Sequence, residues 1–370
     1  MFSHSSVASV CLVWGAALAA ATSCPELAAA QGRELCFVLP LSGPQHPFGE
    51  SIRRGAAFAK EGAASCPGAD EPCALGDVRL VFEDHRGEPT QAASAVRRLL
   101  EAGECSAFVV FGSPPSLAVA DMLERAKKTT IALGSTDKIQ AGRQHIFRSM
   151  PSSSEATKPL VEEAARRGLQ AIASVSTQHD GMLANRDAFA AQRGASFVRE
   201  IAVNPGDSDF RALATKLHAA KPDAVFLTLM PPQASLFARQ LRELGYRGEL
   251  FATNQVESPD EIKAAGPAFN GLWYSREGGP GSEGFFREIS RRYPDGSLMF
   301  AYLGYDAARM LGAALKASDP SGAVAALRDF PGALGPITTK PDHSIDGPMQ
   351  LMVIRDGTPT VLADQATREL

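Results

Sequence analysis

The feature that most limits the possible folds of this chain is a regular alternation of short, apolar, β-rich runs with helical stretches. It begins at 34–39 (ELCFVL), and further strands are expected at 78–83, 107–111 and 130–133. This alternation is typical of parallel strands joined by crossover helices. The run AFVVF at 107–111 is apolar throughout, as expected for a strand covered on both faces. The first part of the chain is therefore predicted to form an open parallel sheet between two layers of helices.

The same rhythm restarts after Arg148. Four more strands, each separated by a helical stretch, are expected at 171–176, 196–202, 224–229 and 249–252. A chain of 370 residues is long for a single core. Two such arrays in tandem predict an α/β fold with two doubly wound parallel-sheet lobes. The last quarter departs from the rhythm, with a strand at 272–276, an apolar helix at 299–316 and a hairpin joined by Asp356-Gly357.

The charge pattern excludes some partners. The formal net charge is −4, and basic residues form no run interleaved with aromatic ones. Nucleic acid binding requires a basic surface. We therefore expect no nucleic acid partner.

The N-terminus has the features of an export leader. An uncharged apolar run covers 7–22, and the small residues Ala28-Ala29-Ala30 follow it. This pattern predicts a signal peptide over 1–30 and a mature chain that begins near Gln31. Lipid attachment at Cys24 is the alternative. We expect a periplasmic or otherwise extracytoplasmic protein, although residues 1–6 lack the basic residue usual in a leader.

Four of the six cysteines lie beyond the leader. Cys66 and Cys73 bracket a short polar turn, so we predict a disulfide between them in an oxidising compartment. Cys36 and Cys105 lie in the first and third expected strands. These strands are neighbours in a sheet ordered 2-1-3, so the two cysteines could form a second pair.

No arrangement of residues predicts catalysis. Ser113 follows a strand and precedes a helix, but Pro114 lacks the backbone N–H that an oxyanion hole would need there. The segment 279–284 matches GxGxxG, yet it comes too late in the chain for a dinucleotide site, so we interpret it as a connection between lobes. The histidines are scattered. We therefore expect no enzyme, no metal site and no cofactor.

With these elements placed, the sequence resembles the type I periplasmic binding proteins, and within them the Leu/Ile/Val-binding branch that serves ABC importers. The resemblance covers nearly all of 33–362. It is carried by short segments in a fixed order: Pro40-Leu41-Ser42-Gly43-Pro44, Phe48-Gly49, Phe82-Glu83-Asp84, Gly112-Ser113, Gly134-Ser135-Thr136, Gln144-His145-Ile146-Phe147-Arg148, Asp207-Ser208-Asp209-Phe210, Tyr305-Asp306-Ala307 and Leu334-Gly335-Pro336.

The resemblance implies a monomer that closes two lobes over a small polar ligand and delivers it to an ABC permease in the membrane. It places the N-terminal lobe at 31–149 and 277–335, and the C-terminal lobe at 150–276 and 336–370. Three crossings would join the lobes, near Met150, Arg276 and Pro336. The alternative is a ligand-sensing or regulatory envelope protein of the same fold, without a transport role.

The resemblance also implies which residues contact the ligand, all of them in loops that follow strands. They are Phe48, Ser113, Gly134, Ser135 and Thr136 in the first lobe, and Asp180, Met230 and Asn254 in the second. The second set departs from the amino-acid pattern, because Asn254 stands where the family usually has an acidic residue for the ligand's ammonium group. We expect an amino acid, an amide or a small carboxylate as ligand, with Asp180 able to supply the missing charge.

Overall fold

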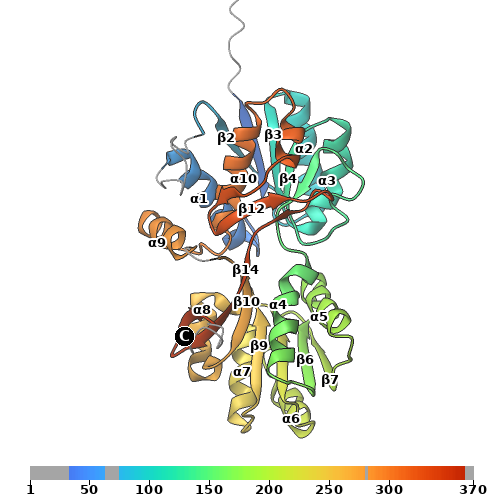
Figure 1. Ribbon diagram of the computed structural model, residues 1–370, viewed down its shortest axis with the longest axis vertical. Coiled ribbons are helices and arrows are strands. Elements are labelled where there is room, and N and C mark those ends of the chain that lie inside the picture. The colour runs from blue at the N-terminus through green and yellow to red at the C-terminus, as the bar shows by residue number, and fades with distance from the viewer. Residues whose placement is uncertain (1–32, 63–74, 280–281, 363–370) are drawn as a thin grey trace, which may run out of the picture. The chain divides into compact units, whose positions relative to one another are not determined.

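The computed structural model describes residues 33–62, 75–279 and 282–362. Figure 1 shows how their helices and strands are arranged. The predicted leader, the alternative lipid site at Cys24 and the predicted Cys66–Cys73 disulfide lie outside these residues.

The first sheet is parallel, with five strands in the order β2-β1-β3-β4-β5. Its strands are β1 (Glu34–Leu39), β2 (Arg79–Asp84), β3 (Cys105–Phe111), β4 (Thr130–Leu133) and β5 (Ile146–Arg148). The crossover helices are α1 (His46–Glu61), α2 (Pro89–Ala102) and α3 (Ser113–Arg125). The order 2-1-3 that the cysteine argument assumed is therefore present.

Alternate residues of β1 enter two different cores. Leu35 and Phe37 pack with residues of α1 and α10 (Ala301–Ala314), whereas Cys36 and Val38 pack with residues of α2 and α3. Successive side chains of a strand point to opposite faces of its sheet. The uniformly apolar sequence of this strand thus reflects burial on both sides, and all six of its residues are buried.

The second sheet contains seven strands in the order β15-β14-β10-β9-β8-β6-β7. Its parallel part is made of β6 (Ile172–Thr177), β7 (Arg199–Val203), β8 (Ala224–Thr228), β9 (Glu249–Thr253) and β10 (Trp273–Glu277), and its antiparallel edge of β14 (Met349–Arg355) and β15 (Thr358–Val361). Its helices are α4 (Ser153–Arg166), α5 (Asp180–Arg193), α6 (Arg211–Ala219), α7 (Gln233–Glu243), α8 (Pro259–Ala265) and the 3₁₀ turns η1 (Asn254–Glu257) and η2 (Gly266–Phe269).

Helices cover both faces of the second sheet as well. Residues of α4 and α5 share one core with Phe226, Phe251 and Trp273, and residues of α6, α7 and α8 share the other with Val225 and Leu250. The ring of Phe251 is stacked on that of Trp273, with centroids 4.5 Å apart. The predicted fold class, two doubly wound parallel sheets with helices on both faces, is confirmed.

The remaining elements pack with the first sheet. They are α9 (Ser282–Arg292), α10, α11 (Pro320–Ala325), β11 (Phe330–Gly332), β12 (Gly335–Thr339) and β13 (Ile345–Asp346). The strands β11, β12 and β13 form a small sheet of their own. Figure 1 shows α10 beside the first sheet and β14 beside β10 of the second.

The third crossing between the sheets lies later in the chain than the position expected near Pro336. Leu334, Ile337 and Ile345 pack with the core that contains α1 and α10, and Arg148 bridges to Ser344. The chain reaches the second sheet only at β14. Burial of Ile337 and Ile345 keeps this segment with the first sheet, so the boundary predicted between 335 and 336 comes too early.

Two glycines allow α1 and α10 to pack closely. A Cβ atom at Gly55 would run into the carbonyl oxygen of Ala301, and one at Gly304 would run into the carbonyl oxygen of Ile52. Glycine is the residue that permits such close backbone approach. This contact fixes α10, and with it the late part of the chain, against the first sheet.

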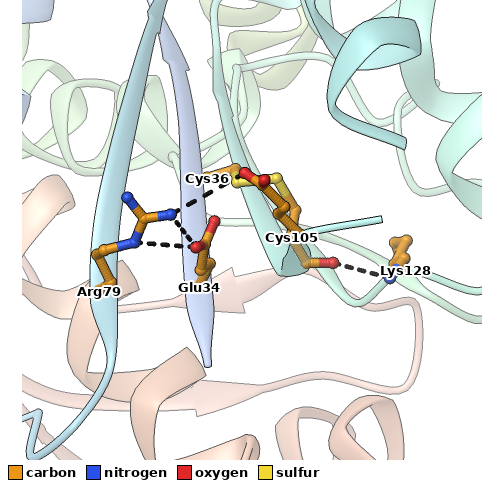
Figure 2. Close-up of a disulfide and its surroundings, with 6 residues drawn as sticks. Glu34, Cys36, Arg79, Cys105 and Lys128 are labelled. Atoms are coloured by element: carbon orange, nitrogen blue, oxygen red, sulfur yellow. Dashed lines mark hydrogen bonds and ion pairs between the residues drawn. A yellow bond between two sulfur atoms is a disulfide. The ribbon is translucent and has the colours of Figure 1, made fainter. Parts of the chain in front are cut away.

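A disulfide joins Cys36 of β1 to Cys105 of β3 (Figure 2), with their Cα atoms 5.7 Å apart. Both cysteines are buried. Nearby, Nε of Arg79 on β2 donates to Glu34 at 2.9 Å, and Nζ of Lys128 donates to the carbonyl oxygen of Cys105 at 2.7 Å. The second of the two predicted pairings is therefore present, and it connects neighbouring strands at the end of the sheet where β1 begins.

Candidate functional site

The carboxyl ends of β3 and β4 bring Ser113, Gly134 and Ser135 together. Gly112 has a φ of 93°, and the turn it makes starts α3 at Ser113. The hydroxyl oxygen of Ser113 accepts a hydrogen bond of 3.0 Å from the backbone N–H of Ser135. A Cβ atom at Gly134 would lie 3.2 Å from the Cα atom of Ser113, so glycine gives the two loops room to meet.

This bond determines what the Ser113 hydroxyl can still do. A serine oxygen that accepts one hydrogen bond retains its own proton to donate. Pro114 and Pro115 occupy the next positions of α3 and have no N–H. The N–H of Ser116 is already bonded to the carbonyl oxygen of Gly112. The start of α3 therefore has few backbone donors, and the side chains of Ser113 and its neighbours become the main ones.

Thr136 and Phe48 extend this surface. Thr136 directly follows Ser135, is half-buried, and accepts from the N–H of Ile139 through its carbonyl oxygen. Phe48, in the first turn of α1, has its ring centroid 5.2 Å from that of Phe300 and 6.3 Å from that of Phe111. Because Phe48 is only half-buried, it adds an apolar wall beside the Ser113 turn.

Asp84, at the end of β2, is used internally. Its carboxylate accepts from the N–H groups of Leu41 (2.9 Å) and Arg86 (2.8 Å) and from the hydroxyl of Ser42. Burial opposes ionisation, but these hydrogen bonds outweigh it and hold the pKa of Asp84 below its usual value. Asp84 thus shapes the loop between β1 and α1 and is not free for acid–base chemistry.

The three expected residues of the second sheet follow β6, β8 and β9, which are neighbours. Asp180 lies in the first turn of α5 and is exposed. The N–H of Met230 donates to the hydroxyl of Thr177 at 2.9 Å, which ties the end of β8 to the end of β6. Asn254 begins η1 and is half-buried. All three therefore lie at one edge of the second sheet, as parallel topology requires.

Each set of predicted residues lies in segments that follow the strands of its own sheet. Across the described ranges, no hydrogen bond or ion pair links the first set to Asp180, Met230 or Asn254. A cavity of about 350 Å³ between the first and second sheets contains none of the predicted residues. The predicted residues thus form two separate polar edges, and a single ligand site formed by both edges stays a prediction.

That cavity lies where the chain passes between the sheets. It is lined by Glu155 of α4, Glu277 at the end of β10, and Tyr302 and Asp306 of α10, with Leu303, Ile337 and Pro348 among its apolar residues. The hydroxyl of Tyr302 donates to the carboxylate of Glu277. Sequence reasoning did not single out Glu277 or Tyr302. Asp306 and Leu334, which also lines the cavity, belonged to segments noted in the sequence. The spacing of one helical turn between Tyr302 and Asp306 was the signal available for Tyr302.

A largely buried ion pair was also missed. The guanidinium of Arg276 donates to the carboxylate of Glu257 in η1, and both side chains are largely buried. Burial raises the pKa of Glu257, although the charge of Arg276 opposes this shift. Glu257 lies three positions after Asn254, so the acidic residue absent at 254 is present in the same turn, where it is paired with arginine.

The described residues also bear on metal binding and on membrane insertion. They contain no cluster of three or more histidine, cysteine or acidic side chains arranged to hold a metal ion. None of their helices is both long and apolar enough to cross a membrane.

Comparison with known proteins adds the family. The model of the periplasmic binding protein family matches residues 35–359. A Leu/Ile/Val-binding protein homolog 2 of Brucella abortus is 24% identical over 318 residues, which cover 81% of this chain and 84% of that protein.

Solved structures share the fold. The branched-chain amino acid substrate-binding protein LivJ of Streptococcus pneumoniae, in complex with isoleucine, has a TM-score of 0.76 at 18% identity, covering 89% of this chain and 98% of that one. A solute-binding protein of an ABC transporter from R. palustris, in complex with benzoate, has a TM-score of 0.72 at 19% identity, covering 89% and 95%.

Proposed function

Because this chain belongs to the periplasmic binding protein family, we propose that it is an extracytoplasmic solute-binding protein of an ABC importer. It captures a small ligand between two lobes and delivers it to a permease in the membrane. One lobe consists of the first sheet, the small sheet and their helices, and the other consists of the second sheet and its helices. The protein acts as a monomer and performs no chemistry on its ligand.

The observation that carries this proposal is the Ser113 turn. Its hydroxyl retains a proton to donate, and the prolines after it remove competing backbone donors. The dipole of α3 also favours negative charge near its start. A carboxylate is the ligand group that best fits such a turn, with the hydroxyl of Thr136 as a second donor.

The polar edge of the second sheet contacts the rest of the ligand. Asp180 is exposed and can pair with an ammonium group, Asn254 offers an amide, and Met230 offers an adaptable apolar contact. Two proteins of this fold hold isoleucine and benzoate, ligands that share a carboxylate and differ in the ammonium group. We therefore propose a small carboxylate as the ligand class, with amino acids as the members that would engage Asp180.

A ligand screen followed by calorimetry tests the proposal. Thermal shift with amino acids, amides, short carboxylates and aromatic acids should find a stabilising ligand, worth about 2.7 kcal/mol at 100 times its Kd. Ser113→Ala should then weaken binding roughly 10- to 100-fold, because a hydrogen bond to a charged group contributes about 1.5–3 kcal/mol.

The matched control is Ser94→Ala, which changes an exposed serine of α2 that bonds only within its own helix. It should bind as the wild type does. Equal affinity of the Ser113 variant and the control would refute the assignment of the Ser113 turn to the ligand site.

A further inference from the structure

Two acidic residues, one at the end of β10 and one on α10, lie near the point where the chain leaves the second sheet. Glu277 is the last residue of β10, and beyond it the chain leaves the second sheet for α9 and α10. Tyr302 of α10 donates its hydroxyl proton to the Glu277 carboxylate. Asp306 lies one helical turn after Tyr302, on the same face of α10. We call Glu277, Tyr302 and Asp306 the joint, since this group contacts elements of both proposed lobes.

The joint opens onto the cavity between the sheets. Glu155, Lys158 and Glu162 of α4 line the same cavity. Asp306 also has a backbone partner, because one of its carboxylate oxygens accepts a hydrogen bond of 2.8 Å from the N–H of Ala333. The carboxyls of the joint therefore lie between α10, which is packed on the first sheet, and α4, which is packed on the second.

Asp306 is buried and Glu277 is half-buried, and this removal from water makes both carboxyls harder to ionise. It raises the pKa of Glu277 to about 7, against the hydrogen bond from Tyr302, and the charges of Asp306 and Glu155 add to the rise while Arg148 opposes it. Burial also raises the pKa of Asp306 to about 7, against the Ala333 N–H and the charge of Arg309. The two groups interact, so their protons leave in successive steps around neutral pH.

The surrounding charges are both acidic and basic. Those that face the joint or its cavity from the neighbouring elements are Arg148 of β5, Glu155, Lys158 and Glu162 of α4, Glu257 of η1, Arg309 of α10 and Asp346 of β13. Several of them are already paired. Glu155 lies 3.3 Å from the Arg148 guanidinium and 3.1 Å from Nζ of Lys340, and Lys340 also pairs with Asp346.

We propose that the joint is a proton-dependent contact between the two lobes. With a proton on the Glu277–Asp306 pair, α10 stays against the end of β10 through the Tyr302–Glu277 hydrogen bond, and α4 stays at the cavity that both helices line. When both carboxyls are ionised they repel each other and Glu155, and the repulsion separates α4 from α10. The proposal for the joint rests on the proposed function in one respect: it treats the two sheets and their helices as lobes that move.

The test needs no ligand. Small-angle scattering of the full mature chain, from pH 5.5 to pH 8.5, should show a radius of gyration that increases in a single transition around neutral pH. Glu277→Gln and Asp306→Asn should each flatten that transition. Glu243→Gln, which changes an exposed residue of α7, is the matched control and should keep the wild-type profile.

A third variant tests the direction of the effect. Tyr302→Phe removes the hydrogen bond that favours the ionised form of Glu277. The midpoint of the transition should therefore move to higher pH, by about one unit. This variant keeps both carboxyls, so it remains informative if either amide variant fails to fold.

Two results would overturn the proposal. The first is a radius of gyration that does not change over this pH range in the wild type. The second is a transition whose midpoint stays in place, or falls, in Tyr302→Phe. Neither depends on ligand affinity, whereas the Ser113→Ala experiment does, so failure of the joint and failure of the proposed function are distinguishable.

Discussion

Removing the Cys36–Cys105 disulfide should markedly destabilise the first sheet. The bond joins residues 69 positions apart, and the loop it closes contains α1, β2 and α2. In the chain-entropy description, closing a loop of this length restricts the unfolded state by about 4 kcal/mol. Cys36→Ala opens the loop, and so does the double change Cys36→Ala with Cys105→Ala. Both variants should therefore lose a similar amount of stability.

Denaturant unfolding followed by circular dichroism measures this loss directly. The free energy of unfolding should fall by roughly 2–5 kcal/mol, the range found when native disulfides are removed. Reductant should destabilise the wild type to the same extent when added with denaturant. It should act slowly under native conditions, because both cysteines are at most 1% exposed.

A control separates loop closure from packing. The single and double variants differ by one buried cysteine side chain, so the difference between them measures packing alone. A loss below about 1 kcal/mol in both variants would refute the chain-entropy argument for this bond. A loss only in the double variant would mean that packing, and not loop closure, accounts for the effect.

Three further predictions concern the packing and charges that support the site. Gly304→Ala should destabilise the protein by about 1–3 kcal/mol, because the new methyl group meets the Ile52 carbonyl oxygen. Gly312→Ala on the same helix meets only the flexible end of Leu75, so thermal unfolding should show a smaller loss of stability for this control. Asp84→Asn should destabilise by about 1–3 kcal/mol at pH 7. The pKa of Asp84 is lowered in the folded state, so its contribution is lost as pH falls below about 4, and the gap between the two unfolding curves should close there; a constant gap would contradict this reasoning. Finally, the mature chain predicted to begin near Gln31 would contain one tryptophan, Trp273, so tryptophan fluorescence should report unfolding of the second sheet. Intact-mass measurement of that chain would show whether cleavage follows Ala30 or a lipid modifies Cys24.

Much of the fold could be predicted from sequence because the central strands of both sheets, such as β1, β3, β6 and β8, are buried on both faces. The run at 34–39 was predicted with the bounds that β1 has, and 130–133 with those of β4. The two lobe cores follow from the same pattern. The third passage was misplaced because Pro336 and the residues after it give no periodic signal, and only the packing of Ile337 and Ile345 assigns them to the first sheet.

The site was less predictable, for a physical reason. Loops after parallel strands must gather at one edge of a sheet, so Ser113 could be placed near Ser135, and Met230 near the end of β6. The contact between Tyr302 and Glu277 depends on how α10 packs at a passage between sheets. The pairing of Glu257 with Arg276 depends on the register of β10 beside β9. Neither arrangement leaves a pattern in the sequence.

The most direct test of the proposed function is a crystal structure of the protein with the best ligand from the thermal-shift screen. We expect the ligand's carboxylate within hydrogen-bond distance of the Ser113 hydroxyl, and its other end against Asp180, Met230 or Asn254. That result would show that the two polar edges form one site. A ligand bound in the cavity beside Glu277 and Tyr302, or bound to one edge alone, would contradict the account.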